Sequence, residues 1–365
     1  MQVTAAVIHE TGDDYQLEEI TLDEPKHGEV MIQIVASGIC HTDVSAQNQL
    51  LPVPLPAVLG HEGAGVVVKT GAGIKGLEAG DHVILSYASC GHCEYCLKGY
   101  SYACEDILPA NFAGKMLDNT HRLHQEDKDL SNFFGQSSFA TYAVANARNV
   151  VKVDKEIDLR LLAPLGCGIQ TGAGAVLNVF NPSPGSSIAI FGSGTVGMSA
   201  LMAAKAAGCT TRIVVDLHDS RLALARELGA THTINSKNVN VVEEVKKISG
   251  KGVNYAIEST GVTEVLREAV LSLAPMGKAG IIGAPKMGTS VQLDVMDMLI
   301  NVKEVVGIHQ GSSIPKVFIP VLIDLYKKGE LPFDKLIKFY DFAEINKAVS
   351  DSKSGATIKP VLTIS

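Results

Sequence analysis

The chain has 365 residues, of which 46% are hydrophobic and 19% charged, and its formal net charge is −8. This length exceeds what one hydrophobic core normally serves, so we expect about two domains. The apolar content excludes a disordered protein. The negative charge and the lack of long Lys or Arg runs argue against a nucleic-acid groove or an anionic membrane surface as a partner.

The start of the chain, Met1-Gln-Val-Thr-Ala-Ala, lacks the apolar segment of a secretion signal, which indicates a reducing, cytoplasmic location. A later stretch, residues 161–204, contains no Asp, Glu, Lys or Arg. Glycines and prolines such as Gly166, Pro182 and Gly185 interrupt it, so no apolar run of about 18 residues remains to span a membrane. We interpret this stretch as buried core of a soluble protein.

Residues 1 to about 150 contain short alternating segments with frequent glycine, at 30–36, 65–69 and 81–85. This pattern indicates a β-rich half. Residues 105–137 are polar and aperiodic, and we expect them to form a long excursion over the surface.

Four of the seven cysteines form a C-x2-C-x2-C-x7-C cluster: Cys90, Cys93, Cys96 and Cys104. A reducing compartment disfavours disulfides, and an iron–sulfur cluster more often shows a tighter run that ends in Cys-Pro. Four thiolates arranged tetrahedrally around Zn²⁺ fit the spacing best. Such a closed set leaves no open coordination position, so we predict a structural zinc and expect the chemistry elsewhere.

After residue 186 the pattern changes to short apolar strands separated by segments of helical length. The predicted strands are 188–191, 212–216, 232–234, 253–258, 280–283 and 305–308. Residues 220–228, followed by Gly229, are typical of a helix with a glycine cap. Six strands that alternate with helices predict a doubly wound parallel sheet. A helix-like segment at 317–328 and a β-like tail at 357–363 follow, and we expect the tail to return to the first half.

A glycine fingerprint follows the first of these strands, with Gly192, Gly194 and Gly197 and with Thr195 and Val196 between them. The first glycine permits a tight turn, the second lets a pyrophosphate approach backbone amides, and the third lets the helix pack on the strand. This motif alone is a weak signal in a chain with 35 glycines. The preceding strand and the following helix strengthen it, and they favour a dinucleotide site.

Asp216 ends the next predicted strand. A carboxylate at that place accepts the ribose hydroxyls and repels a 2′-phosphate, which predicts NAD rather than NADP. The alternative is a glycine-rich turn beside a solvated Asp. Arg221 either reaches the adenosine ribose or is a solvated helix charge, and the sequence leaves both open.

Outside the cluster, Cys40 begins Cys-His-Thr-Asp, His61 lies in Gly-His-Glu-Gly-Ala-Gly, and Cys167 lies in Pro-Leu-Gly-Cys-Gly. Two thiolates and an imidazole would leave an open position on Zn²⁺, as a catalytic site requires. Each residue alone is a weak signal, because a lone Cys is most often a small buried hydrophobe. Spacing does not join residues 40, 61 and 167.

The combination of these motifs resembles the zinc-dependent medium-chain alcohol dehydrogenases over essentially the whole chain. The segments that carry the resemblance are Gly60 to Gly71, Cys40 to Asp43, the four-cysteine cluster, Gly80-Asp81 and the fingerprint. It implies an α/β fold with a β-rich, GroES-like catalytic domain over 1–168 and 316–365. A doubly wound Rossmann domain that binds NAD would occupy 169–315. The apolar strand at 305–308 suggests pairing across subunits, and we expect a homo-oligomer, either a dimer or a tetramer.

The resemblance also implies the metal sites. A catalytic Zn²⁺ would be held by Cys40, His61 and Cys167, and a structural Zn²⁺ by Cys90, Cys93, Cys96 and Cys104. Thr42 would pass the substrate proton, with Asp43 and Glu62 supporting the ligands. Cys209 matches nothing in the family and is interpreted as core.

His41 and Lys359 match positions that contact the cofactor pyrophosphate, and Thr171 lies where the nicotinamide is oriented. One departure concerns the proton relay, because Ser45 stands where some members have a histidine. The proton would then leave through water or through Ser45.

The implied reaction interconverts primary alcohols and aldehydes by hydride transfer to NAD. Residues 164–175 and 135–139 resemble the aryl-alcohol (benzyl alcohol) branch more than the ethanol branch, so we predict aromatic alcohols. The aromatic residues Tyr87, Phe133, Phe134 and Phe139 either form the wall of an apolar pocket or are ordinary packing. The alternatives are a glutathione-dependent formaldehyde dehydrogenase, a general primary alcohol dehydrogenase and a catalytically silent cofactor-binding relative.

Overall fold

The computed structural model describes residues 1–237 and 239–364. The chain divides into two compact units. The first unit comprises Met1–Cys167, Ile314–Val321 and Asp334–Ser365, and the second comprises Gly168–Ser313 and Leu322–Phe333. These units differ from the expected domains, 1–168 with 316–365 and 169–315, at residue 168, at residues 314–315 and at residues 322–333. In the second unit the rings of Tyr326 and Phe333 pack with centroids 4.6 Å apart.

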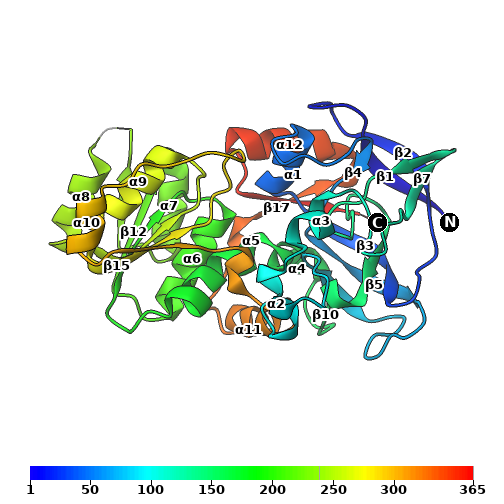
Figure 1. The fold of residues 1–365 in the computed structure, drawn as a ribbon, viewed down its shortest axis with the longest axis horizontal. Coiled ribbons are helices and arrows are strands. Elements are labelled where there is room, and N and C mark those ends of the chain that lie inside the picture. The colour runs from blue at the N-terminus through cyan, green and yellow to red at the C-terminus, as the bar shows by residue number, and fades with distance from the viewer. Residues whose placement is uncertain (238, 365) are drawn as a thin grey trace. The chain divides into compact units, whose positions relative to one another are not determined.

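The first unit contains two largely antiparallel sheets (Figure 1). The five-stranded sheet has the order β4 (Ala57–Val58), β1 (Gln2–Ile8), β2 (Gln16–Leu22), β7 (Leu123–Gln125) and β8 (Lys128–Leu130). The seven-stranded sheet has the order β10 (Val150–Val153), β6 (His82–Leu85), β5 (Gly63–Thr70), β3 (Glu29–Gly38), β18 (Lys359–Thr363) and β17 (Ile337–Asp341), with β9 (Tyr142–Asn146) also paired to β3. Its helices are α1 (His41–Gln47), α2 (Glu94–Leu97), α3 (Ile107–Phe112), α4 (Leu159–Leu162) and α12 (Ile345–Ser354).

Strand β3 organises the seven-stranded sheet because it pairs with β5, β9 and β18. Most of its residues are buried, as expected for a central strand. The predicted return of the C-terminal tail is confirmed, since β18 lies antiparallel to β3 with Val361 opposite Gly38. The last strand of the chain thereby belongs to the same sheet as β3, β5 and β6.

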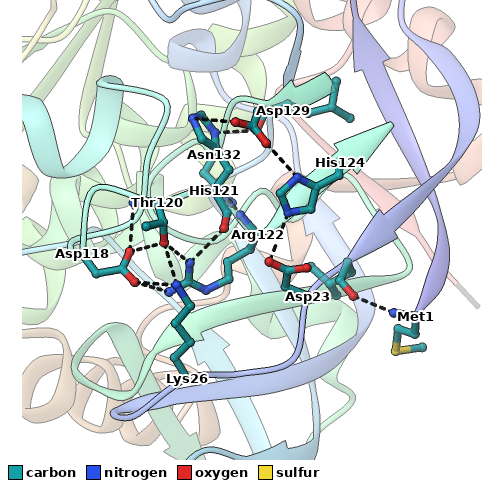
Figure 2. A network of polar contacts seen from close by, with 12 residues as sticks. Met1, Asp23, Lys26, Asp118, Thr120, His121, Arg122, His124, Asp129 and Asn132 are labelled. Carbon is teal, nitrogen blue, oxygen red and sulfur yellow. Dashed lines mark hydrogen bonds and ion pairs between the residues drawn. The ribbon is translucent and has the colours of Figure 1, made fainter. Parts of the chain in front are cut away.

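The predicted irregular excursion at 105–137 is wrong in part, because this segment contains α3 and the hairpin of β7 and β8. Polar contacts order it. Arg122 is fully buried and donates to both carboxylate oxygens of Glu29, at 2.9 and 2.6 Å. Figure 2 shows Arg122 and Lys26 converging on Asp118, with distances of 2.8 and 3.1 Å. Asp118 and Arg122 therefore bind each other and two residues outside the segment, whereas the charged residues at 126–129 are exposed, as expected for a surface segment.

The second unit contains a six-stranded parallel sheet, as predicted (Figure 1). Its order is β13 (His232–Asn235), β12 (Thr211–Asp216), β11 (Ser187–Phe191), β14 (Val253–Glu258), β15 (Leu273–Ile281) and β16 (Glu304–Gly307). The apolar side chains of β11 are buried, which is typical of a central parallel strand. Strand β15 begins well before the predicted 280–283, because Pro275 and Gly277 interrupt the apolar pattern of its first part.

Consecutive strands of this sheet are connected by the helices α6 (Thr195–Ala206), α7 (Asp219–Leu228), α8 (Val241–Ser249), α9 (Thr263–Leu271) and α10 (Val295–Ile300). The helix α5 (Gly168–Gly174) precedes β11, and α11 (Pro315–Lys327), whose residues are divided between the two units, follows β16. The predicted glycine cap of α7 is confirmed, since Gly229 has a φ of 114°. The uncharged stretch at 161–204 includes the wholly buried α5. Within residues 1–237 and 239–364, no helix has the length and apolar character needed to cross a membrane.

Candidate active site and metal centres

The four-cysteine cluster gathers as its spacing predicts. The Sγ atoms lie within 4.8 Å of one another, with Cys90 to Cys96 and Cys93 to Cys104 each at 4.0 Å. Sulfurs placed tetrahedrally about 2.3 Å from Zn²⁺ are about 3.8 Å apart. None of the seven cysteines, all of which lie in the described residues, is in a disulfide. The cluster therefore has the dimensions that a four-thiolate zinc site needs.

The thiols of this cluster have unequal acidities. Hydrogen bonds from the backbone of Glu105 and Cys96 lower the pKa of Cys93 to about 6, whereas burial raises the pKa of Cys104 to about 12. Backbone N–H groups of Cys93 and Cys96 also donate to the sulfurs of Cys90 and Cys93. Such bonds favour thiolates, which are the form that binds a metal.

A second cluster joins Cys40, His61 and Cys167 with Glu62, each contributing one ligand atom within 4.8 Å of the others. The sheet register explains why residues so distant in sequence meet. Ser37 lies opposite Gly63, so the chain that leaves β3 and the chain that enters β5 share one edge. Cys167 reaches the same edge because its neighbour Gly166 accepts a hydrogen bond from Ser86, just after β6.

Asp43 fixes the orientation of His61. Its Oδ1 lies 2.9 Å from Nδ1 of His61, and its Oδ2 accepts the backbone N–H of Cys40 at 2.9 Å. Both side chains are fully buried. The remaining ring nitrogen, Nε2, is buried and has no hydrogen-bond partner among the described residues. When the proton is on Nδ1, the lone pair is on Nε2. That nitrogen can then bind a metal together with the two sulfurs.

The local electrostatics also favour a cation. A hydrogen bond with Cys167 is the main cause that lowers the pKa of Cys40, and the same contact raises the pKa of Cys167. Burial lowers the pKa of His61, but the carboxylate of Asp43 and the sulfur of Cys40 outweigh it and raise that pKa. The cluster thus concentrates negative charge in a buried place, which a divalent cation would neutralise.

Lys359 lies beside this cluster and binds Glu62. Its Nζ is 2.8 and 3.1 Å from the two carboxylate oxygens and 2.9 Å from the carbonyl oxygen of Ile39. A lysine ammonium has three hydrogens, and each has an acceptor here. A contact of Lys359 with the cofactor pyrophosphate, which the resemblance implied, requires one of these bonds to be exchanged.

The neighbouring residues of α1 differ in exposure. His41 is exposed and Thr42 is partly exposed, whereas Ser45 is buried. The Oγ1 of Thr42 lies 3.7 Å from Sγ of Cys40. The hydroxyl of Thr42 is therefore next to the candidate ligands, as a proton-transfer group would need to be.

The glycine fingerprint has the geometry that its motif requires. Gly192 has a φ of 94°, and a Cβ on Gly197 would lie 1.9 Å from the carbonyl oxygen of Gly192. A Cβ on Gly194 would meet no atom within 4 Å, so this position faces open space. Thr195 and Val196 begin α6. The helix that carries Thr171 packs closely on it, since Gly172 approaches the carbonyl oxygen of Val196.

Asp216 has its hydrogen bonds already satisfied. Its Oδ2 accepts the backbone N–H and the hydroxyl of Ser193, at 2.7 and 2.5 Å, and its Oδ1 accepts the N–H groups of Leu217 and His218. Burial would raise its pKa, but these bonds outweigh burial and lower it. Asp216 is therefore an ionised acceptor, and any ribose hydroxyl must share or replace one of these donors.

Asp216 lines a hollow of about 330 Å³, including the open solvent at its mouth. Its lining residues come from the carboxyl ends of β11, β12 and β14, from the segment after β13 and from α9; they are Phe191, Gly192, Val215, Asp216, Leu217, Ser236, Thr260, Val265 and Glu268. Ligands of doubly wound sheets bind at this edge. Arg221 does not line the hollow, but its Nε is buried without a hydrogen-bond partner among the described residues, and its charge helps to lower the pKa of Asp216.

Aromatic side chains surround His61. The Phe134 ring lies 4.5 Å from the imidazole, centroid to centroid, and the Phe133 ring lies at 5.6 Å. Phe112 contacts both phenylalanines. Phe139 instead packs on Tyr15, and Tyr87 hydrogen-bonds Ser101. The predicted aromatic set thus divides, with Phe133 and Phe134 next to the candidate metal ligand.

Sequence reasoning missed three features of these sites. It did not indicate the bond of Ser193 to Asp216, the pairing of Lys359 with Glu62, or the position of Glu268 in the hollow. Of these, only the role of Ser193 could have been anticipated from the sequence, because Ser193 lies inside the glycine fingerprint. The other two depend on contacts between distant segments.

Comparisons with known proteins agree with this geometry. Residues 26–155 match the alcohol dehydrogenase GroES-like domain, and residues 195–328 match the zinc-binding dehydrogenase family. Geraniol dehydrogenase of Castellaniella defragrans is 41% identical over 361 residues, covering 98% of this chain and 96% of that protein. The chain belongs to the zinc-dependent medium-chain alcohol dehydrogenase family. This confirms the predicted family and its fold class, a GroES-like domain with a Rossmann domain.

Two solved structures are similar along the whole chain. An alcohol dehydrogenase zinc-binding domain protein from Burkholderia ambifaria has 50% identity and a TM-score of 0.98, covering 100% of this chain and 99% of that one. Benzyl alcohol dehydrogenase from Acinetobacter calcoaceticus has 46% identity and a TM-score of 0.97, covering 100% of both chains. The chain is therefore an enzyme of the alcohol dehydrogenase type.

Proposed function

We propose that this enzyme interconverts aromatic primary alcohols and their aldehydes, with NAD as the hydride carrier. The observation that carries the aromatic assignment is the contact of the Phe134 ring with the imidazole of His61, at 4.5 Å between centroids and tilted by 31°, with Phe133 beside it. A flat apolar ring fits against such side chains. The 46% identity to the benzyl alcohol dehydrogenase supports the same choice.

In this proposal Cys40, His61 and Cys167 hold one Zn²⁺, and Cys90, Cys93, Cys96 and Cys104 hold another. Zn²⁺ bound by two thiolates and an imidazole supplies Lewis-acid stabilisation of an alcohol oxygen. Asp43 keeps the proton on Nδ1 of His61, so that Nε2 faces the site. The ion pair of Lys359 with Glu62 holds a further carboxylate against these residues. The zinc of the four-cysteine cluster stabilises the fold and takes no part in the reaction.

The alcohol proton needs an acceptor, and we assign that role to Thr42. Its hydroxyl lies 3.7 Å from Sγ of Cys40 and is partly exposed, so it can accept a proton and pass it onward. His41 is exposed next to it, and the buried Ser45 or water would take the proton further. The hydroxyl thereby links the buried site to solvent.

We propose that the fingerprint and the hollow bind NAD. Gly194 leaves space for the pyrophosphate, Asp216 accepts the adenosine ribose, and Arg221 lies close enough to Asp216 to lower its pKa. Thr171 would orient the nicotinamide. Formation of NADH from NAD, compared with formation of NADPH from NADP, by the purified enzyme tests the cofactor, and faster turnover with NADP would contradict the assignment of Asp216.

Geraniol is a second candidate substrate, because the geraniol dehydrogenase is 41% identical over nearly the whole chain. The adduct of formaldehyde with glutathione is a third. A panel of benzyl alcohol, geraniol, ethanol and S-hydroxymethylglutathione, followed by NADH absorbance, separates them. We expect the highest kcat/KM with benzyl alcohol. Faster turnover of any other member would replace the aromatic assignment, and no turnover at all would favour a silent cofactor-binding protein.

We further propose a cytoplasmic enzyme that forms a dimer or tetramer. The support for an oligomer is that β16 is an edge strand of the parallel sheet in the part of the chain that the structure describes, because an edge strand can pair with a second copy. Light scattering of the purified protein tests this, and a monomeric mass would end it.

A further inference from the structure

The hollow in the second unit contains two carboxylates with different surroundings. Asp216 accepts hydrogen bonds from Ser193 and from the backbone after β12. Glu268, in contrast, makes no side-chain hydrogen bond or ion pair with any residue in 1–237 or 239–364. Glu268 is partly buried, and the part of its hydration that burial removes is not replaced by a protein donor, which has a free-energy cost.

The helix α9 directs Glu268 into the hollow. Val265, which precedes Glu268 by one helical turn, lines the same hollow, so both lie on one face of α9. The adjacent Leu266 and Ala269 are buried in the core and fix the rotation of the helix. Burial raises the pKa of Glu268. A ligand donor in the hollow would offset this cost.

The rest of the lining suits a flat heteroaromatic ring. Phe191, Val215, Leu217 and Val265 supply apolar surface. Asp216 stands at the end of β12, where a dinucleotide places its ribose. A base attached to that ribose would lie between the apolar residues. The hydrogen-bond donor that adenine presents on its edge is the exocyclic amino group.

We propose that Glu268 accepts a hydrogen bond from the amino group of adenine and so selects adenine over purines that lack it. The inference rests on the proposed use of NAD and names the residue that recognises the base. Hypoxanthine has a carbonyl oxygen in place of the amino group, and two acceptors that face each other repel. Glu268 is thus a specificity residue for the cofactor, remote from the reacting atoms.

The test compares binding of NADH with binding of its hypoxanthine analogue, which carries the same reduced nicotinamide. The chain has no Trp, so nicotinamide fluorescence reports both ligands without a tryptophan background. We expect the wild type to bind NADH about tenfold more tightly, as a hydrogen bond to a charged group allows. In Glu268→Gln the amide can donate to the carbonyl or accept from the amine, so the affinity ratio should approach one.

Glu264→Gln is the matched control, because Glu264 lies on the same helix, is exposed and loses the same charge. It should keep the wild-type ratio. An equal ratio in the wild type and in Glu268→Gln would overturn the inference. The inference would also be overturned if Glu268→Gln bound NADPH more tightly than the wild type does and kept the wild-type preference for adenine over hypoxanthine. Glu268 would then act on the ribose phosphate. If the wild type binds neither dinucleotide, the proposed cofactor itself fails, whereas equal binding of both leaves NAD use standing and removes only the role of Glu268.

Discussion

The carboxylate of Asp43 and the imidazole of His61 form a fully buried pair, with Oδ1 of Asp43 2.9 Å from Nδ1 of His61. The same carboxylate accepts the N–H of Cys40. One side chain thus orients two of the candidate metal ligands. Cys40 and His61 come from separate segments of the chain, and their shared bonds to Asp43 fix how the two ligands are placed relative to each other.

Replacing Asp43 with Asn should weaken metal binding at this cluster. The amide cannot stabilise the Nδ1 proton as a carboxylate does, and loss of such a partner typically lowers metal affinity by about 10- to 100-fold. Competition with a chelator, followed by metal analysis, measures the change. Asp127→Asn, on an exposed loop of the same unit, is the control and should bind zinc as the wild type does. Unchanged zinc retention in the Asp43 variant would contradict the role given to this pair.

The two cysteine clusters should differ in what their metals do. We expect two zinc atoms per subunit in the wild type and one in either Cys40→Ser or Cys93→Ser. The Cys40 variant should lose turnover and keep most of its thermal stability. The Cys93 variant should lose stability. Its cluster offers no open coordination position, so its metal would serve only to hold the loop together. Zinc content, Tm and kcat together test this, and a wild-type content of one zinc would remove one of the two sites.

Asp216→Ser should shift cofactor preference toward NADP. The substitution removes the negative charge that repels a 2′-phosphate, and we expect the ratio of kcat/KM for NAD to that for NADP to fall by about tenfold or more, the scale of a lost bond to a charged group. Asp219→Ser is the control, since Asp219 is exposed at the start of α7. An unchanged ratio in the Asp216 variant would mean that another group contacts the ribose.

Phe134→Leu should lower activity on aromatic alcohols more than on ethanol. Contacts between aromatic rings contribute about 0.5 to 1.5 kcal/mol beyond apolar burial, so kcat/KM for benzyl alcohol should fall by up to about tenfold. Phe339→Leu, on the exposed part of β17, provides the control. Equal losses for both alcohols would assign Phe134 to packing around His61 instead of to substrate selection.

Asp118 should make the stability of the first unit sensitive to acid. Burial would raise its pKa, but hydrogen bonds from Arg122, Thr120 and Lys26 outweigh burial and hold the pKa well below its usual range. Because the folded-state pKa lies below the unfolded value of about 3.9, ionised Asp118 stabilises the fold above that pH, and the stabilisation is lost as the pH falls toward the folded-state pKa.

The variant Asp118→Asn should therefore have a lower Tm than the wild type at neutral pH and a smaller dependence of Tm on pH below about 4. Thermal unfolding at a series of pH values measures both. Asp127→Asn again serves as the control, and parallel Tm profiles for wild type and Asp118→Asn would refute the role of this ion-pair network.

Several features could be read from the sequence because they depend on residues that are close along the chain. The spacing of Cys90, Cys93, Cys96 and Cys104 predicts a cluster, and the thiols lie within 4.8 Å of one another. The fingerprint predicts a turn between a strand and a helix, and Gly192 has the positive φ that the turn needs. Apolar runs and glycine caps similarly predict the parallel sheet and α7.

Other features could not be predicted, because the same sequence pattern is compatible with different structures. Polar residues at 105–137 indicated an exposed loop, yet Arg122 is fully buried there by its bonds to Glu29. The start of β15 does not stand out in the sequence because Pro275 and Gly277 interrupt its apolar pattern. A pattern of polarity cannot distinguish a charge that meets water from a charge that meets a distant partner.

The sequence by itself therefore determined the family, the four-thiolate cluster and the dinucleotide fold, since each depends on local spacing within a loop, a strand or a turn. Spacing alone does not join Cys40, His61 and Cys167, which the family resemblance grouped and the tertiary structure brings together. Only the tertiary structure paired Lys359 with Glu62 and turned Glu268 toward the hollow. These contacts depend on strand register and on helix rotation. Both are set by burial of the whole sheet, and neither is encoded in any single segment.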